Sequence, residues 1–284
     1  MKHYIENEYA AVCVKEPGAE LSSFRSKASG REYLWQGDPD VWYGQSPLLF
    51  PIVGTLLNNK CLVDGKEYEM FRHGIARKRD FIEKTSGDAY VILTQSYDDE
   101  TLKRYPYKYS LDIKYSLDGK KLTAGYTVLN DDDKTMYFSI GAHPGFNCAI
   151  GDYLEFEEPE NLKCEKINEL AVLDGKLYPT LENSRRFDIT EHVFDDDAHI
   201  LSGMKSESLR IVSAAGKPYI SFDFGKVPYL GLWAKPGAEY ICIEPWYGIN
   251  DSMEPCGDIS QKRGIIPLEP GREFVFSWSA EFIE

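Results

Sequence analysis

The stretch that decides the fold is Tyr107-Lys108-Tyr109-Ser110-Leu111-Asp112-Ile113-Lys114-Tyr115-Ser116-Leu117-Asp118-Gly119. Apolar or aromatic residues alternate with polar residues up to Leu117, and this period of two is typical of a half-buried β-strand. The dipeptide Asp118-Gly119 readily takes the positive φ angles of a tight hairpin turn. The alternation resumes at Leu122 and continues to Val128, so the stretch predicts two paired antiparallel strands.

Similar alternation and turn residues recur through the rest of the chain. Short hairpins are expected where apolar runs flank Asp64-Gly65 and Ala215-Gly216. Helical signals are few: Asp98 or Asp99 is a candidate N-cap for one or two turns that end before Pro106. The remaining expected strands are 61–63, 67–68, 136–140, 209–212, 219–222 and 274–282.

These signals predict an all-β fold with few short helices, arranged as one large antiparallel β-sandwich. Strand signals extend from near the N-terminus to the C-terminus, and no low-complexity linker interrupts them. A hydrophobic fraction of 43% is sufficient for a sizeable core. We therefore expect residues 1–284 to form a single domain.

Charge and composition narrow the classes of partner and compartment. The formal net charge is −14, so nucleic acid and anionic membranes, which attract positive proteins, are not expected as partners. The N-terminus lacks an apolar signal-peptide region, and no apolar run approaches the ~20 residues of a membrane-spanning helix. We expect a cytoplasmic protein with reduced thiols and no Cys-x-x-Cys motif. The scattered cysteines are Cys13, Cys61, Cys148, Cys164, Cys242 and Cys256.

Three ionisable residues stand in unusual surroundings. His73 lies in Phe-Arg-His-Gly-Ile-Ala-Arg (71–77), and His143 lies in Gly-Ala-His-Pro-Gly-Phe-Asn (141–147). Glu244 interrupts an apolar run, and a buried carboxylate is costly unless it is paired or hydrogen-bonded. Glycine permits close backbone approach, and aromatic faces suit sugar rings.

Each of these residues also has a purely structural interpretation. A histidine beside a glycine is often a turn residue, and Glu244 could serve a backbone amide or an arginine. His3, His192 and His199 lack comparable surroundings, and we interpret them as surface or structural residues.

The segments together resemble the aldose 1-epimerase (galactose mutarotase) family, in its bacterial branch with short motifs. The resemblance covers nearly the whole chain and implies the large antiparallel β-sandwich of that family. It also implies interconversion of the α and β anomers of a hexose by acid–base ring opening and closure. The matching segments, in chain order, are 46–54, 73–77, 141–147, 243–248 and 258–271.

The resemblance also assigns chemical roles. Glu244 would be the general base, His143 the general acid, and His73 a second histidine near the ring oxygen or a neighbouring hydroxyl. One proton leaves the C1 hydroxyl while another reaches the ring oxygen, so a carboxylate and an imidazole suffice. The expected enzyme is therefore an isomerase without a cofactor or a metal.

Further residues are implied in binding the sugar. Arg77 would bind sugar hydroxyls, Trp233 would form an aromatic wall, and Asp197, in the short motif 196–198, would hydrogen-bond the sugar. The expected partner is a small-molecule sugar or sugar phosphate, bound by a monomer or a homodimer.

Two features depart from the family pattern and leave the sugar open. Thr55 stands where the family commonly has an arginine after Gly54. Arg72 and the run Arg77-Lys78-Arg79 form a basic cluster in an acidic chain. The cluster is either a solvated strand end or a docking site for a phosphorylated sugar, as in hexose-6-phosphate 1-epimerases.

The sequence is also compatible with three other functions. Two histidines and a carboxylate could form a facial metal triad. A carbohydrate-binding protein could keep the aromatic platform without turnover. A glycoside hydrolase needs two carboxylates, for which Asp197 or Asp223 could join Glu244.

Overall fold

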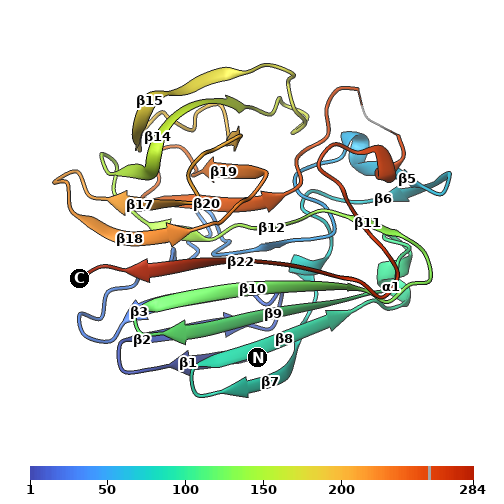
Figure 1. The fold of residues 1–284 in the computed structure, drawn as a ribbon, viewed down its shortest axis with the longest axis horizontal. Coiled ribbons are helices and arrows are strands. Elements are labelled where there is room, and N and C mark those ends of the chain that lie inside the picture. The colour runs from blue at the N-terminus through green and yellow to red at the C-terminus, as the bar shows by residue number, and fades with distance from the viewer. Residues whose placement is uncertain (255–256) are drawn as a thin grey trace.

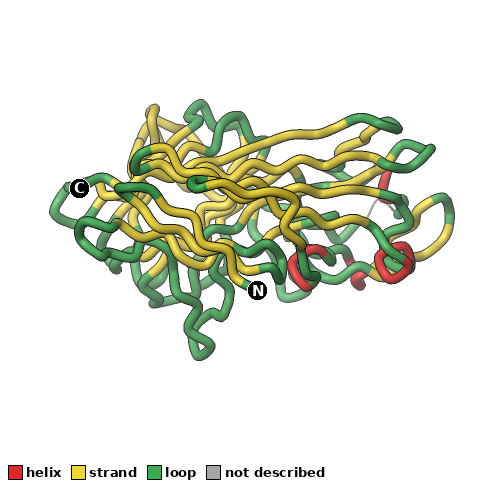
Figure 2. The backbone as a smooth tube through the Cα atoms, turned by 90° about the horizontal axis from the view of Figure 1, so that it is seen from below, coloured by secondary structure: helices red, strands yellow, loops and turns green. Residues whose placement is uncertain are grey.

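A computed structural model describes residues 1–254 and 257–284, so Cys256 lies outside the described residues. The protein's regular structure is mainly antiparallel strands, and within the described residues the main sheet has 15 of them. Successive strands of this sheet follow one another up the molecule from β7 to β18 in Figure 1. Figure 2 shows the strands stacked in layers, with the longer loops gathered along one side. The predicted all-β sandwich is confirmed.

The main sheet runs through the whole molecule. One half contains the strands β7 (Ile82–Gly87), β8 (Tyr90–Ser96), β9 (Tyr109–Asp118), β10 (Lys121–Asn130), β22 (Glu273–Phe282), β18 (Pro218–Asp223) and β17 (Ser208–Val212). The other half contains β14 (Tyr153–Glu165), β16 (His199–Ser202), β19 (Tyr229–Trp233), β20 (Tyr240–Tyr247), β12 (Ile140–Ala142) and β4 (Leu48–Leu49). Off this path, β15 (Tyr178–Asp188) pairs with β14 and β13 (Gly145–Asn147) pairs with β20.

Three smaller sheets complete the fold. They comprise β1 (Lys2–Glu6), β2 (Ala10–Lys15) and β3 (Leu21–Ser26); β5 (Lys60–Val63) and β6 (Lys66–Glu69); and β11 (Met136–Phe138) with β21 (Ile266–Leu268). The helical segments of the described chain are α1 (Asp99–Leu102), η1 (Leu57–Asn59), η2 (Ala76–Lys78) and η3 (Ile259–Gln261). Asp98 caps α1 as expected, because its carboxylate accepts from the amides of Glu100 and Thr101. None of these helices is long and apolar enough to cross a bilayer.

The β9–β10 hairpin forms as its alternation predicts. Leu117 pairs with Leu122 and Ile113 with Tyr126, so apolar residues meet on one face of the sheet. This face packs against the three-stranded sheet in a shared core. The Tyr115 hydroxyl joins the two layers by donating to the Ala19 carbonyl at 2.9 Å. The predicted hairpins β5–β6 and β17–β18 are also present.

One predicted strand is wrong. Residues 136–140 do not form a single strand but divide at Ser139 into β11 and β12, which belong to different sheets. The Ser139 amide donates to the Pro51 carbonyl at 2.7 Å, and its hydroxyl accepts from the Val53 amide at 3.0 Å. These contacts with a distant segment turn the chain from one sheet to the next.

Candidate functional site

Strand β20 forms the floor of a pocket. Because side chains alternate across a strand, Cys242, Glu244 and Trp246 share one face while Ile241 and Ile243 face the opposite side. Every residue of β20 except its last is buried, and Glu244 is 1% exposed. The strand therefore presents a carboxyl group inside the protein.

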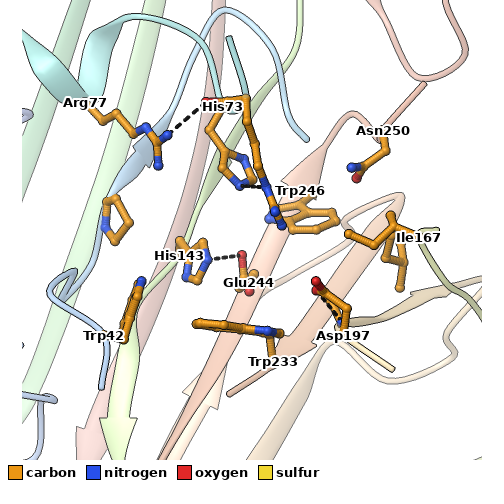
Figure 3. Close-up of a pocket in the computed structure, with 14 residues that line it drawn as sticks. Trp42, His73, Arg77, His143, Ile167, Asp197, Trp233, Glu244, Trp246 and Asn250 are labelled. Carbon is orange, nitrogen blue, oxygen red and sulfur yellow. Dashed lines mark hydrogen bonds and ion pairs between the residues drawn. The ribbon is translucent and has the colours of Figure 1, made fainter. Parts of the chain in front are cut away.

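His143 reaches Glu244 because of how two short strands pair with β20. Strand β12 ends just before His143, β13 begins two residues after it, and both pair with β20. The connection Ala142-His143-Pro144-Gly145 consequently passes along β20. His143 Nε2 lies 3.2 Å from Glu244 Oε2 (Figure 3). Residues 101 positions apart in the sequence thus form one carboxyl–imidazole pair.

His73 is held by an unusual backbone conformation. His73 and Gly74 have φ angles of 63° and 71°, and a Cβ on Gly74 would lie 2.2 Å from the Phe50 carbonyl oxygen. The His73 amide donates to the Gly54 carbonyl at 2.8 Å, and the Gly54 amide donates back to His73 Nδ1 at 3.2 Å. The close approach expected from the His-Gly pair is confirmed at Gly74.

The hydrogen-bond donors around His73 determine which ring nitrogen carries its proton. Arg72 Nε lies 3.2 Å from His73 Nε2, so N–H donors face both ring nitrogens. A neutral imidazole accepts at only one nitrogen. The Gly54 amide is fixed in the backbone, so we assign Nδ1 as the acceptor and the proton to Nε2. The Arg72 side chain is then free to turn toward another acceptor.

Aromatic side chains form the walls of the pocket. Trp233, at the end of β19, packs edge-on against the imidazole of His143, with ring centroids 5.8 Å apart. Trp42 stacks on the same imidazole at 5.1 Å and on Tyr240 at 5.3 Å (Figure 3). Sequence reasoning missed Trp42, although Trp42-Tyr43-Gly44 repeats the aromatic-aromatic-glycine pattern of Trp246-Tyr247-Gly248.

All six residues singled out from the sequence line one cavity of about 210 Å³. Asp197 has a left-handed backbone, φ 70°, and its carboxylate accepts from the Ala198 amide at 2.7 Å. Arg77, in η2, donates through Nη2 to the Arg72 carbonyl at 3.0 Å (Figure 3). The complete lining is Trp42, Pro47, Arg72, His73, Arg77, His143, Ile167, Asp197, Ala198, Ile200, Trp233, Glu244, Trp246 and Asn250.

The four basic residues of the cluster at Arg72 and 77–79 lie in two different places. Arg72 and Arg77 line the cavity, while Lys78 is exposed and Arg79 pairs with Asp98 outside it. Thr55 is buried outside the cavity lining.

Burial controls the electrostatics of the cavity. It raises the pKa of the Glu244 carboxyl well above its usual range, although the Arg72 guanidinium acts in the opposite direction. Burial likewise lowers the pKa of His143 to about 3. Burial, followed by the charge of Arg72, lowers the pKa of His73 well below its usual value. Burial therefore favours Glu244 as a neutral carboxylic acid and His143 as a neutral imidazole, so that the uncharged pair shares one titratable proton.

A different set of residues from the predicted triad has the spacing of metal ligands. In the described part of the chain, one group of three His, Cys or carboxylate residues has ligand atoms all within 4.8 Å of one another, namely His143, Cys242 and Glu244. His73 is not in this set.

The fold and the pocket define the class as an antiparallel β-sandwich protein with a buried carboxyl–imidazole pair between aromatic walls. Residues 1–254 match the family described as aldose 1-epimerase. The chain belongs to the aldose 1-epimerase family, whose members are isomerases that act on carbohydrates.

Relatives and solved structures agree with this family. The plasmid-encoded protein LacX of Lactococcus lactis is 35% identical over 95% of this chain and 96% of its own. A galactose mutarotase related enzyme from Lactobacillus acidophilus superposes with a TM-score of 0.94, at 30% identity over 100% of this chain and 98% of that one. A galactose mutarotase-like protein from Lactobacillus casei gives a TM-score of 0.93, at 31% identity over 100% of both chains.

Proposed function

We propose that this protein is an aldose 1-epimerase that interconverts the α and β anomers of a hexose. The observation that supports it most directly is the 3.2 Å contact between His143 and Glu244 on the floor of an aromatic pocket. Transfer of the shared proton from Glu244 to His143 yields a carboxylate base and an imidazolium acid. These are the two groups that ring opening requires.

The proposed steps use residues of this chain alone. The Glu244 carboxylate takes the proton of the C1 hydroxyl while His143 gives a proton to the ring oxygen, and the C1–O5 bond breaks. Rotation about the C1–C2 bond presents the other carbonyl face, and the reverse proton transfers close the ring. His73, which carries its proton on Nε2, donates a hydrogen bond to the ring oxygen or a neighbouring hydroxyl. Trp42 and Trp233 pack against the sugar ring.

Polarimetry tests this proposal. Freshly dissolved α-glucose and α-galactose change optical rotation as they equilibrate, and the protein should accelerate that change. Binding of a sugar without any acceleration would instead indicate a carbohydrate-binding protein. Cleavage of a chromogenic glycoside would indicate a hydrolase with Asp197 as its second carboxylate, since Asp223 does not line the cavity.

A phosphorylated hexose is the second candidate substrate, and Arg72 and Arg77 favour it. Both guanidiniums line the cavity, and neither pairs with a carboxylate among the described side chains. Arg77 Nε is buried without a hydrogen-bond partner in that part of the chain, and the N–H donors of arginine match phosphate oxygens. A higher kcat/KM for glucose 6-phosphate than for glucose, lost in Arg72→Ala, would support it. Equal values would favour the free sugar.

A further inference from the structure

A cysteine lies beside the proposed acid–base pair without a part in the reaction. Cys242 precedes Glu244 by two residues on β20 and therefore lies on the same face of the strand. Its Sγ, a Glu244 carboxylate oxygen and a His143 ring nitrogen lie within 4.8 Å of one another. Anomer exchange needs one acid and one base but no thiol. The position of Cys242 is thus unexplained by the proposed function.

In residues 1–254 and 257–284, His143 Nδ1 has no hydrogen-bond partner, and Glu244 Oε2 has none apart from its 3.2 Å contact with His143 Nε2. His143 is 9% exposed and Glu244 is 1% exposed, so water reaches neither side chain freely. A buried polar atom without a partner costs about 1–3 kcal/mol. A cation that takes an electron pair from the carboxylate and one from the imidazole would replace their single mutual contact.

The spacing suits a metal ion that accepts sulfur, nitrogen and oxygen ligands. Tetrahedral Zn²⁺ holds S at about 2.3 Å and N or O at about 2.0–2.2 Å, which places ligand atoms roughly 3.3–3.6 Å apart. His143 Nε2 and Glu244 Oε2 are already 3.2 Å apart. The Cys242 Sγ lies no more than 4.8 Å from the other two ligand atoms. It therefore needs to approach by at most roughly 1.5 Å, which a change in side-chain torsion supplies.

We propose that His143, Cys242 and Glu244 form a Zn²⁺-binding site at the floor of the pocket, with Cys242 buried behind the lining. Three bonds to zinc form, from Sγ, Nε2 and a carboxylate oxygen. The thiol proton and the proton shared by Glu244 and His143 pass to solvent, and nothing is oxidised or reduced. Because zinc occupies both groups of the acid–base pair, zinc and sugar compete. The competition rests on the proposed function, whereas zinc binding does not.

Titration with Co²⁺ tests the site, since a cobalt–thiolate bond has a charge-transfer absorption. The full-length protein is reduced, freed of metal with a chelator and titrated. The wild type should bind one Co²⁺ per chain with this absorption, and Zn²⁺ should displace it. Cys242→Ser should abolish the absorption, and Glu244→Gln should weaken binding at least ~10-fold. Cys164→Ser is the matched control, because Cys164 is an equally buried thiol on β14.

Two results would overturn the proposal: no thiolate absorption in the wild type at millimolar Co²⁺, or the same absorption in Cys242→Ser. Cys242→Ala replaces the serine variant if circular dichroism shows that the latter does not fold. Mutarotation of the metal-free wild type is measured alongside. Activity without cobalt binding contradicts the zinc site alone, and cobalt binding without activity contradicts the proposed function alone.

Discussion

Strands β9 and β20 belong to the same sheet and obey the same alternation, yet they have different surroundings. In β9 the apolar face is in the core, while residues such as Asp112 and Lys114 point toward solvent. In β20 both faces are covered, one by the core and one by the pocket walls. A polar side chain on the outer face of β9 stays hydrated and loses little free energy on folding. In β20 the Glu244 carboxyl is removed from water, and its pKa rises as a result.

The largest loss of activity is expected from a substitution of Glu244 in strand β20. Glu244→Gln should reduce the mutarotation rate by ~10²–10⁴-fold, because it removes the base and keeps the shape of the side chain. Because the folded protein keeps the Glu244 carboxyl protonated while the unfolded chain ionises it, the free energy of unfolding falls as pH rises above the unfolded pKa. Glutamine does not ionise, so the variant should melt higher at neutral pH. Polarimetry and thermal unfolding measure both. The control Glu239→Gln, an exposed residue just before β20, should change neither.

The corresponding substitution in β9 should change stability instead of chemistry. Ile113 is fully buried opposite Tyr126, and Ile113→Ala should lower the free energy of unfolding by about 2–5 kcal/mol. Denaturant unfolding measures this loss. The rate per folded molecule should stay at the wild-type value. A large fall in that rate would show that the packing of β9 is coupled to the chemistry of the pocket.

The pH dependence of kcat/KM tests whether burial sets the pKa values of Glu244 and His143. The active form of the pair carries one proton, which it loses as pH rises through the raised pKa of Glu244. Above that pKa, kcat/KM should fall about tenfold per pH unit. On the acid side the rate should persist to pH about 3, the pKa of His143. An acid limb centred near the ordinary histidine value would contradict the burial argument.

A smaller loss of activity is expected from substitution of Trp42, which lines the pocket but lies in neither β9 nor β20. Trp42→Ala removes the ring stacked on His143, and such contacts are worth about 0.5–1.5 kcal/mol. We expect KM to rise by up to about tenfold, with a smaller change in kcat. Steady-state kinetics on the preferred sugar measures both constants. An unchanged KM would indicate that Trp42 supports His143 without contacting the sugar.

The smallest effect is expected on the exposed face of β9. Asp112→Asn removes an ion pair with Lys84, whose Nζ lies 2.6 Å from the carboxylate. Exposed pairs of this kind contribute about 0.2–1 kcal/mol, so denaturant unfolding should shift only slightly. A loss as large as that of Ile113→Ala would remove the distinction between the two faces.

Much of the fold was predictable because its signals are local. The β9–β10 hairpin, the Asp64-Gly65 turn and strand β22 follow from alternation and from the backbone preferences of Asp and Gly. Residues 136–140 were misjudged because Ser139 bonds to Pro51 and Val53, which are remote in sequence. A periodic pattern contains no information about such a change of sheet.

The candidate site was predictable only in part. His73, His143 and Glu244 stand out in sequence and line one cavity, while their catalytic roles remain proposals. Arg72 was noted for its charge but not for its contact with His73. Trp42 and Cys242 were not selected, because what distinguishes them is the side chain that each one touches.

The sequence by itself determined the all-β class, the principal hairpins and the family, since these depend on residue order and local backbone preference. Only the tertiary structure decided that β12 and β13 place His143 beside Glu244 and that Cys242 joins them. It also shifted the pKa of each group in the pair toward its uncharged form, because that pKa depends on the side chains that exclude water from the group. Those side chains come from segments far apart in the chain, and only the folded protein brings them together.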